Sequence, residues 1–575
     1  MASGYAQDGD AAGTFLGHPK GLFVLFFAEM WERFSYYGMR ALLIFYLTKH
    51  WLFSDSESGI IYGAYTALVY ITPVLGGYLA DRYLGQRKAV TYGAVLLTFG
   101  HLMMGFEGSG GQDAASLNVF WLALAFIIVG SGFLKANISV IVGQLYPRTD
   151  VRRDGAYTIF YMGINLGAAL GSILCGYLGE TYGWSYGFGA AGIGMLFGLA
   201  VFIWFKPLLV GRGEPANPAL IEQTKWGIKF EWLLYLVGLV AVAVCWWMVQ
   251  NQSIVGTLLG AAGLILVLYI LSIAMFKIPF GSFASAPEVP VILYFVGIAA
   301  IALSVFTSVA SPILGLATIP AILTGAALIL GVVAHQFVST RSDDRDRIFA
   351  AMFLILGSIL FWALFEQAGS SLNLYTDRYV ERGGVPASVF QSINAIYIVL
   401  LAPLFAWLWT WLGRKGLEPS TPAKFGIALV QLGAGFLVLV AGAAAGGELT
   451  PVIFIFLIYL LHTTGELCLS PVGLSAMNRL APAHMASLIM GTWFFASATG
   501  NFAAGLIAAA SGSEAASGEG AGKEVVLGVY SQIGWVAIGV GVAVFIIAPI
   551  IKKLMHLDTL KDDVSAAAPQ PIPSN

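Results

Sequence analysis

Long apolar runs separated by short polar segments make up most of the chain. Six runs lie near residues 21–49, 57–80, 89–107, 117–145, 156–179 and 184–205, and six more near 349–374, 388–412, 424–445, 451–478, 487–510 and 527–551. Each can form a helix of about 20 residues or more, which is long enough to cross a bilayer. The connections are mostly short, so neighbouring helices are antiparallel. The pattern predicts two six-helix bundles with a site between them at the midplane.

A central insert separates the two bundles. It carries further apolar runs near 230–249, 254–276, 290–308 and 313–338, which favours four extra spans, with two as the alternative. An even number keeps the second bundle in the orientation of the first. The predicted organisation is a cytoplasmic N-terminus at 1–20, bundles at 21–206 and 349–551 with the insert at 207–348 between them, and a cytoplasmic tail at 552–575.

Basic residues are distributed unevenly between alternate loops. Lys and Arg gather before the first run and after even-numbered runs, for example at Lys20, Arg82, Lys206 and Arg414, whereas 50–56, 108–116 and 180–183 contain none. By the positive-inside rule, both termini are cytoplasmic.

Composition excludes several classes of protein. Of the 575 residues, 58% are hydrophobic and only 10% are charged, which predicts a polytopic helical membrane protein rather than a soluble one. No basic cluster with interleaved aromatic residues suggests nucleic-acid binding. The cysteines, Cys175, Cys245 and Cys468, are widely spaced in apolar runs, so we interpret them as small core residues and expect no metal site.

The first apolar run contains charges that lipid disfavours. Glu29, Glu32, Arg33, Tyr36 and Tyr37 follow helical spacing and therefore share one face. A charge at the bilayer centre costs at least about 2.5 kcal/mol, so this face must point to a polar interior. Two carboxylates share one arginine, which favours a substrate or proton path. The alternative is a buried ion pair that only locks helices together.

Two further polar residues interrupt later runs. Lys135 would be too costly as an unpaired ammonium, so it needs a carboxylate partner from the protein or from a substrate. Asn165 offers both a donor and an acceptor within the membrane, either to a ligand or to a neighbouring helix.

Several motifs carry a resemblance to a known family. The stretch Glu29-Met-Trp-Glu-Arg-Phe-Ser-Tyr-Tyr-Gly38 is similar to the first-helix signature of the proton-dependent oligopeptide transporter family, bacterial branch, within the major facilitator superfamily. Segments 160–168, 361–372 and 465–475 resemble later signatures of that family. The resemblance implies an all-α major facilitator fold in the bacterial inner membrane. It also implies a proton-coupled symporter of di- and tripeptides, which is not an enzyme and uses the proton gradient rather than a cofactor.

The resemblance also implies roles for individual residues. Proton coupling is assigned to Glu29, Glu32, Arg33 and Glu366. Substrate binding is assigned to Arg33, Tyr36, Tyr37, Tyr70, Lys135, Asn165, Trp362, Asn394, Glu466, Ser470 and Trp493. We expect Glu366 to lie opposite Arg33, and Lys135 with Glu466 to bracket the two charged ends of a peptide. The two tryptophans would line a side-chain pocket, although packing is the alternative that physics favours.

The loop between the second and third runs resembles the gating loop of the superfamily. Its segment Gly77-Tyr-Leu-Ala-Asp-Arg-Tyr-Leu-Gly-Gln-Arg-Lys88 contains Asp81, Arg82 and Arg87, which we expect to pin the two halves together in one state. The alternative is a plain basic loop. One departure from the animal members of the family is Gly63, which stands where they carry a histidine, so glutamates must carry the proton.

Other functions compete with peptide transport. A carrier of nitrate or another small metabolite would share the fold, but a small anion would not need Glu466. A membrane prenyl-transfer enzyme could use an acidic cluster such as Asp343-Asp344-Arg-Asp346 to hold a metal diphosphate. A single such cluster among arginines is more simply a solvated turn.

Overall fold

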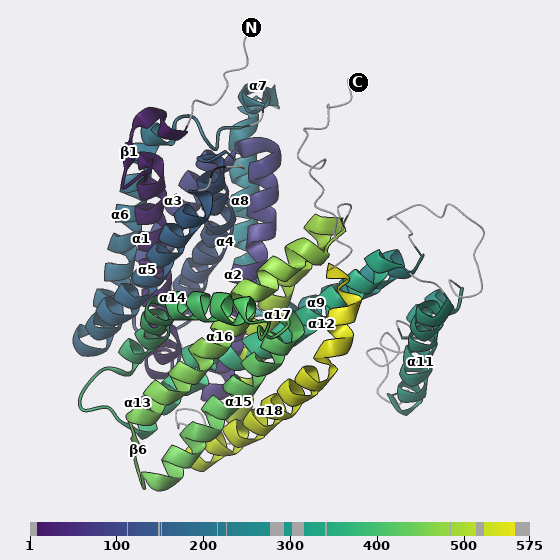
Figure 1. Ribbon diagram of the computed structural model, residues 1–575. Coiled ribbons are helices and arrows are strands. Elements are labelled where there is room, and N and C mark those ends of the chain that lie inside the picture. The colour runs from purple at the N-terminus through teal and green to yellow at the C-terminus, as the bar shows by residue number, and fades with distance from the viewer. Residues whose placement is uncertain are drawn as a thin grey trace. The chain divides into compact units, whose positions relative to one another are not determined.

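The computed structural model describes residues 9–111, 113–147, 150, 152–215, 217–225, 227–276, 292–301, 315–339, 342–482, 485–512 and 522–557. The chain divides into two compact units. The first comprises Met1–Gly260, Leu354–Ser475 and Met490–Ala548, and the second comprises Ala261–Phe353, Ala476–Ile489 and Pro549–Asn575. Figure 1 shows that nearly all regular structure is helical.

The helices follow the predicted apolar runs closely. The first six are α1 (Lys20–Phe45), α2 (Asp55–Leu79), α3 (Gln86–Met104), α4 (Ala114–Gln144), α5 (Arg153–Tyr182) and α6 (Trp184–Phe205). The last six apolar runs form α12 (Asp343–Phe365) with α13 (Ser371–Tyr379), α14 (Ser392–Arg414), α15 (Thr421–Ala445), α16 (Ile453–Leu480), α17 (Ala486–Ser511) and α18 (Lys523–Leu554). Boundaries fall at polar residues, as where Ser54 and Glu57 form a capping box at the start of α2.

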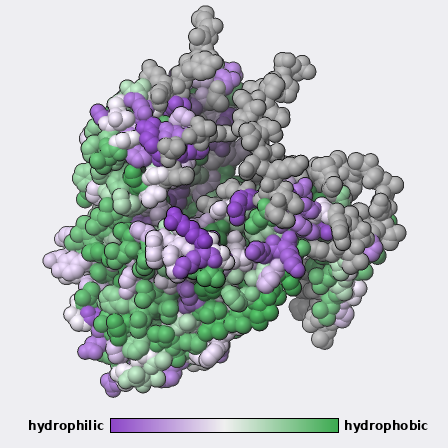
Figure 2. Space-filling model, in the orientation of Figure 1, coloured by the Kyte–Doolittle hydropathy of each residue, from purple (hydrophilic) through white to green (hydrophobic). Residues whose placement is uncertain are grey.

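Twelve helices in the described part of the chain are long and apolar enough to cross a membrane. Helices α1 and α3 are not among the twelve, because the charges that each carries lower its mean hydropathy. On the face drawn in Figure 2, hydrophobic side chains make up much of the surface. This is typical of a multi-pass membrane protein whose helices contact lipid.

The sequence predicts one continuous helix for the first run of the second half, whereas the structure divides this run into two helices. Helix α12 ends at Phe365, the 3-10 turn η6 follows at Glu366–Gly369, and α13 begins at Ser371. Ser370 lies between them with φ −124° and ψ −101°, outside the helical region. The break falls at Glu366, so this carboxylate stands at a helix end.

The insert provides two long helices, α8 (Phe230–Gln250) and α9 (Gln252–Phe276). Of the other two predicted spans, the run near 290–308 is described only at 292–301, its remaining residues lying outside the described part. The run near 313–338 corresponds to α11 (Gly315–Ser339), which contains a shorter apolar helix, Leu323–His335. The predicted number of extra spans stays a prediction.

The second unit has a small core of its own. Met275, Tyr294, Ile329 and Val332 are buried together, and the Tyr294 hydroxyl donates to the Leu268 carbonyl oxygen at 2.6 Å.

The acidic cluster at the start of α12 also lies in the second unit. Asp344 pairs with Arg347 at 3.2 Å and Asp346 with Arg345 at 2.9 Å. The cluster is therefore an ion-paired helix start.

The strands are short and peripheral. Strands β1 (Thr14–Phe15) and β2 (His18–Pro19) form an antiparallel hairpin, as do β3 (Thr224–Lys225) and β4 (Ile228–Lys229). Strands β5 (Val380–Glu381) and β6 (Thr450–Pro451) pair in parallel.

Glycines let α5 approach α1 closely. A β-carbon on Gly167 would lie 2.1 Å from the Met30 carbonyl oxygen, and one on Gly171 would lie 2.2 Å from that of Phe34. Small residues at this spacing allow helix backbones to pack against each other in a membrane. The register of α1, and with it the position of its charged face, therefore depends on α5.

We expect Gly171→Ala to lower the melting temperature of the detergent-purified protein. The methyl group must displace the α1 backbone, and overpacking of this kind costs about 1–3 kcal/mol. Gly189→Ala on α6 is the matched control, because its new methyl group meets no atom within 4 Å. A melting temperature for Gly171→Ala equal to that of the control would contradict the close packing of α1 on α5.

Candidate functional site

The charged face of α1 forms a compact ion-pair cluster. Arg33 Nε lies 2.7 Å from Glu29 Oε1 and 3.2 Å from Glu32 Oε2. Both carboxylates are buried, with exposed fractions of 1% and 0%. The structure therefore brings together two carboxylates on one arginine, as the sequence predicts.

A second arginine on α1 makes the contact that we expected of Arg33. Arg40 Nη2 donates to Glu366 Oε2, and Arg40 Nε donates to the Tyr62 hydroxyl on α2. The expectation that Glu366 lies opposite Arg33 is therefore wrong. Arg40 lies two helical turns beyond Arg33 on the same face, and this spacing is the signal that the sequence reading missed.

The helix break after α12 makes room for this contact. Glu366 is 4% exposed and begins the turn η6, which ends at Gly369 and is followed by Ser370. A β-carbon on Gly369 would lie 1.9 Å from the Tyr62 hydroxyl oxygen. Glycine at this position therefore leaves room for the Tyr62 hydroxyl that bonds Arg40.

Lys135 on α4 lies against aromatic rings. Its Nζ is 3.9 Å from the centroid of Tyr36 and 5.3 Å from that of Tyr70. The ammonium is buried and has no hydrogen-bond partner among the described residues. Glu29 and Glu32 interact with it electrostatically but form no ion pair within 4 Å, so cation–π contacts stand where we expected a carboxylate.

A cavity of about 200 Å³ lies between helices of the two halves. Seven of its lining residues belong to the predicted substrate set, namely Tyr37, Tyr70, Asn165, Trp362, Asn394, Glu466 and Ser470. Arg40 and Glu366 line the same cavity. Asn394 Nδ2 donates to Glu466 Oε2 and to Thr463 Oγ1, both at 3.0 Å. The cavity wall therefore carries two separate polar groups: the ion pair of Arg40 with Glu366, and Glu466 hydrogen-bonded by the Asn394 amide.

Four predicted substrate residues do not line this cavity, namely Arg33, Tyr36, Lys135 and Trp493. Arg33 is engaged by the two carboxylates on its own helix. Trp493 packs on Phe425, with ring centroids 6.3 Å apart, and against Gly473, which favours the packing alternative for this tryptophan.

Some lining residues were not among the predicted site residues. Besides Arg40, these include Ser172, Tyr161, Gln391 and Tyr459. Tyr161 precedes Asn165 by one helical turn, and the Asn165 amide donates to its carbonyl oxygen at 3.1 Å. Helical spacing from a predicted site residue could have found three of them, because Tyr161 lies one turn before Asn165, Ser172 lies two turns after Asn165, and Tyr459 lies two turns before Glu466.

Two of the predicted gating residues have partners in the first bundle or in the insert. Asp81 Oδ1 accepts from Gln86 Nε2 at 2.7 Å, and Arg87 pairs with Glu214 at 2.5 Å. Arg82 is exposed. The expectation that Asp81 and Arg87 pin the two halves together does not describe this structure, because Gln86 belongs to the first bundle and Glu214 to the insert, and neither belongs to the second bundle.

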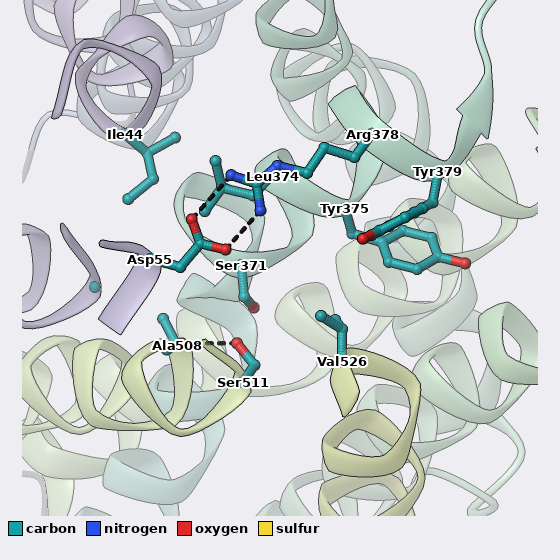
Figure 3. Close-up of a pocket in the computed structure, with 11 residues that line it drawn as sticks. Ile44, Asp55, Ser371, Leu374, Tyr375, Arg378, Tyr379, Ala508, Ser511 and Val526 are labelled. Carbon is teal, nitrogen blue, oxygen red and sulfur yellow. Dashed lines mark hydrogen bonds and ion pairs between the residues drawn. The ribbon is translucent and has the colours of Figure 1, made fainter. Parts of the chain in front are cut away.

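Contacts between the halves gather at the opposite helix ends. Arg378 on α13 pairs with Asp55 on α2 through two bonds of 2.5 and 2.9 Å, as Figure 3 shows. The cavity beside this pair is only about 10 Å³, at the lower limit for one water. Lys49 also pairs with Asp377 at 2.6 Å. The halves are therefore closed against each other at the end that carries the loop 50–56.

Other predicted side chains have structural partners. His462 Nε2 on α16 lies 3.1 Å from the Leu432 carbonyl oxygen on α15, which is a contact between helices. The three cysteines are free and buried. Within the described ranges, no group of three or more His, Cys, Asp or Glu side chains is arranged to hold a metal ion.

Comparison with known proteins identifies the family. The model of the POT family matches residues 87–214 and 235–520, which together exceed half of the chain. This chain belongs to the POT family. It is a membrane transporter of the major facilitator type, which overturns the prenyl-transfer alternative.

Relatives of this POT family member include characterised transporters. The peptide transporter YePEPT of Yersinia enterocolitica is 36% identical over 509 residues, covering 86% of this chain and 88% of the relative. A di-/tripeptide transporter of Lactococcus lactis is 31% identical over 507 residues, covering 84% and 88%. A crystal structure of peptide transporter POT in complex with sulfate is 33% identical, with a TM-score of 0.67, and covers 96% of this chain and 99% of that one.

We expect Arg40→Met to destabilise this POT family member strongly and Glu366→Gln to destabilise it less. Arg40→Met leaves the buried Glu366 without its partner, and breaking a buried pair costs about 3–5 kcal/mol when a charge is left behind. Glu366→Gln removes the opposite charge, but its amide oxygen can still accept from Arg40. The double variant removes both partners, so its loss should be smaller than the sum of the single losses. Thermal unfolding in detergent measures all three.

Arg414→Met provides the control, because Arg414 is exposed at the end of α14. Its melting temperature should stay close to that of the unaltered protein. Additive losses in the double variant would contradict direct pairing of Arg40 with Glu366.

Proposed function

We propose that this POT family member is a proton-coupled symporter that imports di- and tripeptides by alternating access. The observation that carries the proposal is the cavity that holds Arg40 with Glu366 and also Glu466 with Asn394. A peptide has a charged group at each end, and this cavity offers a charged group of each sign. Names of the relatives support the cargo, because they include peptide and di-/tripeptide transporters.

The charges on the cavity wall suggest how proton and peptide are coupled. Arg40 carries +1, whereas Glu366 and Glu466 each carry −1 when ionised, so the three together carry −1. Glu466 is then available for a peptide ammonium. Arg40 is paired with Glu366 until the Glu366 carboxylate takes a proton. Only then can Arg40 bind the carboxylate of a peptide. A proton on Glu366 and a bound peptide therefore favour each other.

The buried cluster of α1 has a supporting role in this proposal. Glu29, Glu32 and Arg33 lie on the same helix as Arg40, and Lys135 lies near them on α4. A proton leaving Glu366 has carboxylates about two and about three helical turns away from Arg40 along α1, at Glu32 and Glu29. We assign Glu29, Glu32 and Arg33 to proton coupling. Tyr36, Lys135 and Trp493 are neighbours of the cavity rather than direct ligands.

The moving parts would be the bundles at 21–206 and 349–551. Ion pairs Asp55–Arg378 and Lys49–Asp377 hold them together at the end that the positive-inside rule assigns to the outside. The proposed state is therefore closed to the outside. Asp81, Arg82 and Arg87 lie at the other end, where they would pair across the halves only after these bundles rock.

Location and energy source complete the proposal. Loops rich in Lys and Arg support an inner membrane protein with both termini in the cytoplasm. Transport would be driven by the proton gradient and needs no cofactor. Nitrate or another small metabolite is the second candidate cargo, but a small anion gives no role to the Glu466–Asn394 pair.

We expect proteoliposomes that contain the protein to accumulate labelled dialanine when an inward proton gradient is imposed. Glu366→Gln cannot exchange a proton at this position, so it should lose accumulation against a concentration gradient. Exchange of internal for external dialanine should persist, because exchange needs no net proton movement. Accumulation by Glu366→Gln equal to that of the unaltered protein would exclude Glu366 as the coupling site.

Glu466→Gln tests the amino-terminal end of the clamp. The unaltered protein should transport dialanine with a KM at least tenfold lower than that of N-acetyl-dialanine, because only the former has an ammonium. Glu466→Gln should raise the KM for dialanine and bring the two values together. Glu57→Gln, an exposed cap of α2, is the control and should keep the preference. Retained discrimination in Glu466→Gln would assign the ammonium to another group.

A further inference from the structure

An apolar groove opens on the membrane-facing side of the first half, away from the transport cavity. It has a volume of about 360 Å³ and lies between the hairpin β1–β2, the start of α1 and the end of α6, which Figure 1 shows side by side. The lining residues are Phe15, Lys20, Phe23, Val24, Phe27, Val201, Phe205 and Leu208. All but Lys20 are apolar. We call this feature the α1–α6 groove.

The hairpin places one wall of the groove. Leu16 and Gly17 form its two-residue turn with φ of 50° and 80°, the left-handed values that such a tight hairpin turn requires. Phe15 precedes the turn and stacks edge to face on Phe23, with centroids 4.9 Å apart. Phe15 is 55% exposed and Leu16 is 76% exposed, so the hairpin presents apolar side chains outward.

The hairpin is fixed to the rest of the first half by polar bonds. Arg152 Nη1 donates to the Gly17 carbonyl oxygen at 2.9 Å, and His18 Nδ1 lies 2.8 Å from the Tyr146 hydroxyl. Arg152 is itself held by Asp10 and Asp150, and its hydrogen bonds hold the pKa of Asp150 below the ordinary range. The groove is therefore formed in advance and does not need a ligand to shape it.

One lysine lines the groove, and a second directly follows the lining residue Phe205 in the chain. Lys20 lines it and begins α1, and Lys206 begins the turn η4 (Lys206–Leu209), two residues before the lining residue Leu208. The helix ends are in contact, because a β-carbon on Gly21 would lie 2.8 Å from the Leu208 carbonyl oxygen. Both lysines are exposed, and neither has an acidic partner among the residues that the structure describes.

We propose that the α1–α6 groove binds an anionic phospholipid. The apolar wall of phenylalanine and valine side chains fits an acyl chain, and Lys20 with Lys206 fits the phosphate of the headgroup. This end of α1 is predicted to lie at the cytoplasmic surface, where basic pockets between helices bind such headgroups. The bound lipid would brace the start of α1, the helix that carries Arg33 and Arg40.

Native mass spectrometry of the full-length protein, purified in detergent, tests this proposal. Dioleoyl phosphatidylglycerol should remain bound at higher activation energy than dioleoyl phosphatidylcholine and should raise the melting temperature more. The double variant Lys20→Gln/Lys206→Gln should lose most of this preference, since each lysine contributes about fivefold in affinity. Lys552→Gln/Lys553→Gln, at the end of α18, removes two exposed lysines elsewhere and should keep it.

A second variant separates the acyl chain from the headgroup. Val201→Trp fills the groove and leaves both lysines, so it should also lower retention of phosphatidylglycerol. Glycerol 3-phosphate, which has no acyl chain, should not displace the lipid. The proposal is overturned if the lysine variant retains phosphatidylglycerol as the unaltered protein does, if phosphatidylcholine binds equally well, or if glycerol 3-phosphate displaces the lipid.

Discussion

The bond between Arg40 and Glu366 is the interaction on which the arrangement of the transport cavity depends. Both groups are buried, and a bilayer interior tolerates neither charge alone. The bond joins the first helix of one half to the broken first helix of the other. Three nearby features support this bond: α5 sets the register of α1, the turn at 366–369 places Glu366 at a helix end, and the Tyr62 hydroxyl accepts a second bond from the guanidinium. The bond therefore depends on segments from both halves.

The second polar cluster is balanced in charge but incompletely bonded. Glu29 and Glu32 face Arg33 and Lys135, two negative groups against two positive ones, yet Glu29 Oε2 and Lys135 Nζ have no hydrogen-bond partner among the described residues. Buried polar groups without partners are costly. A cluster of this kind has no single preferred arrangement of bonds, which suits a site where protons and charges must be redistributed.

The order and the ends of the helices could be predicted from the sequence, because apolar length and polar loops fix them locally. The broken helix could not, since Glu366, Gln367 and the segment 369–371 can equally be polar positions within one continuous span, and the sequence does not distinguish the two. The arginine that pairs with Glu366 could not be predicted from the sequence either. Arg33 and Arg40 share a face of α1, and which of them meets Glu366 is decided by packing between segments more than 300 residues apart. The same holds for Lys135, whose aromatic neighbours on α1 and α2 depend on tertiary structure.

Gly369 has a wider consequence for how related chains can be sorted. A β-carbon there would lie 1.9 Å from the Tyr62 hydroxyl oxygen, so a relative with alanine at the equivalent position needs its tyrosine to shift. Such a shift alters the hydroxyl's bond to the arginine. This pair of positions is therefore where members of the family can differ in how firmly the arginine is held.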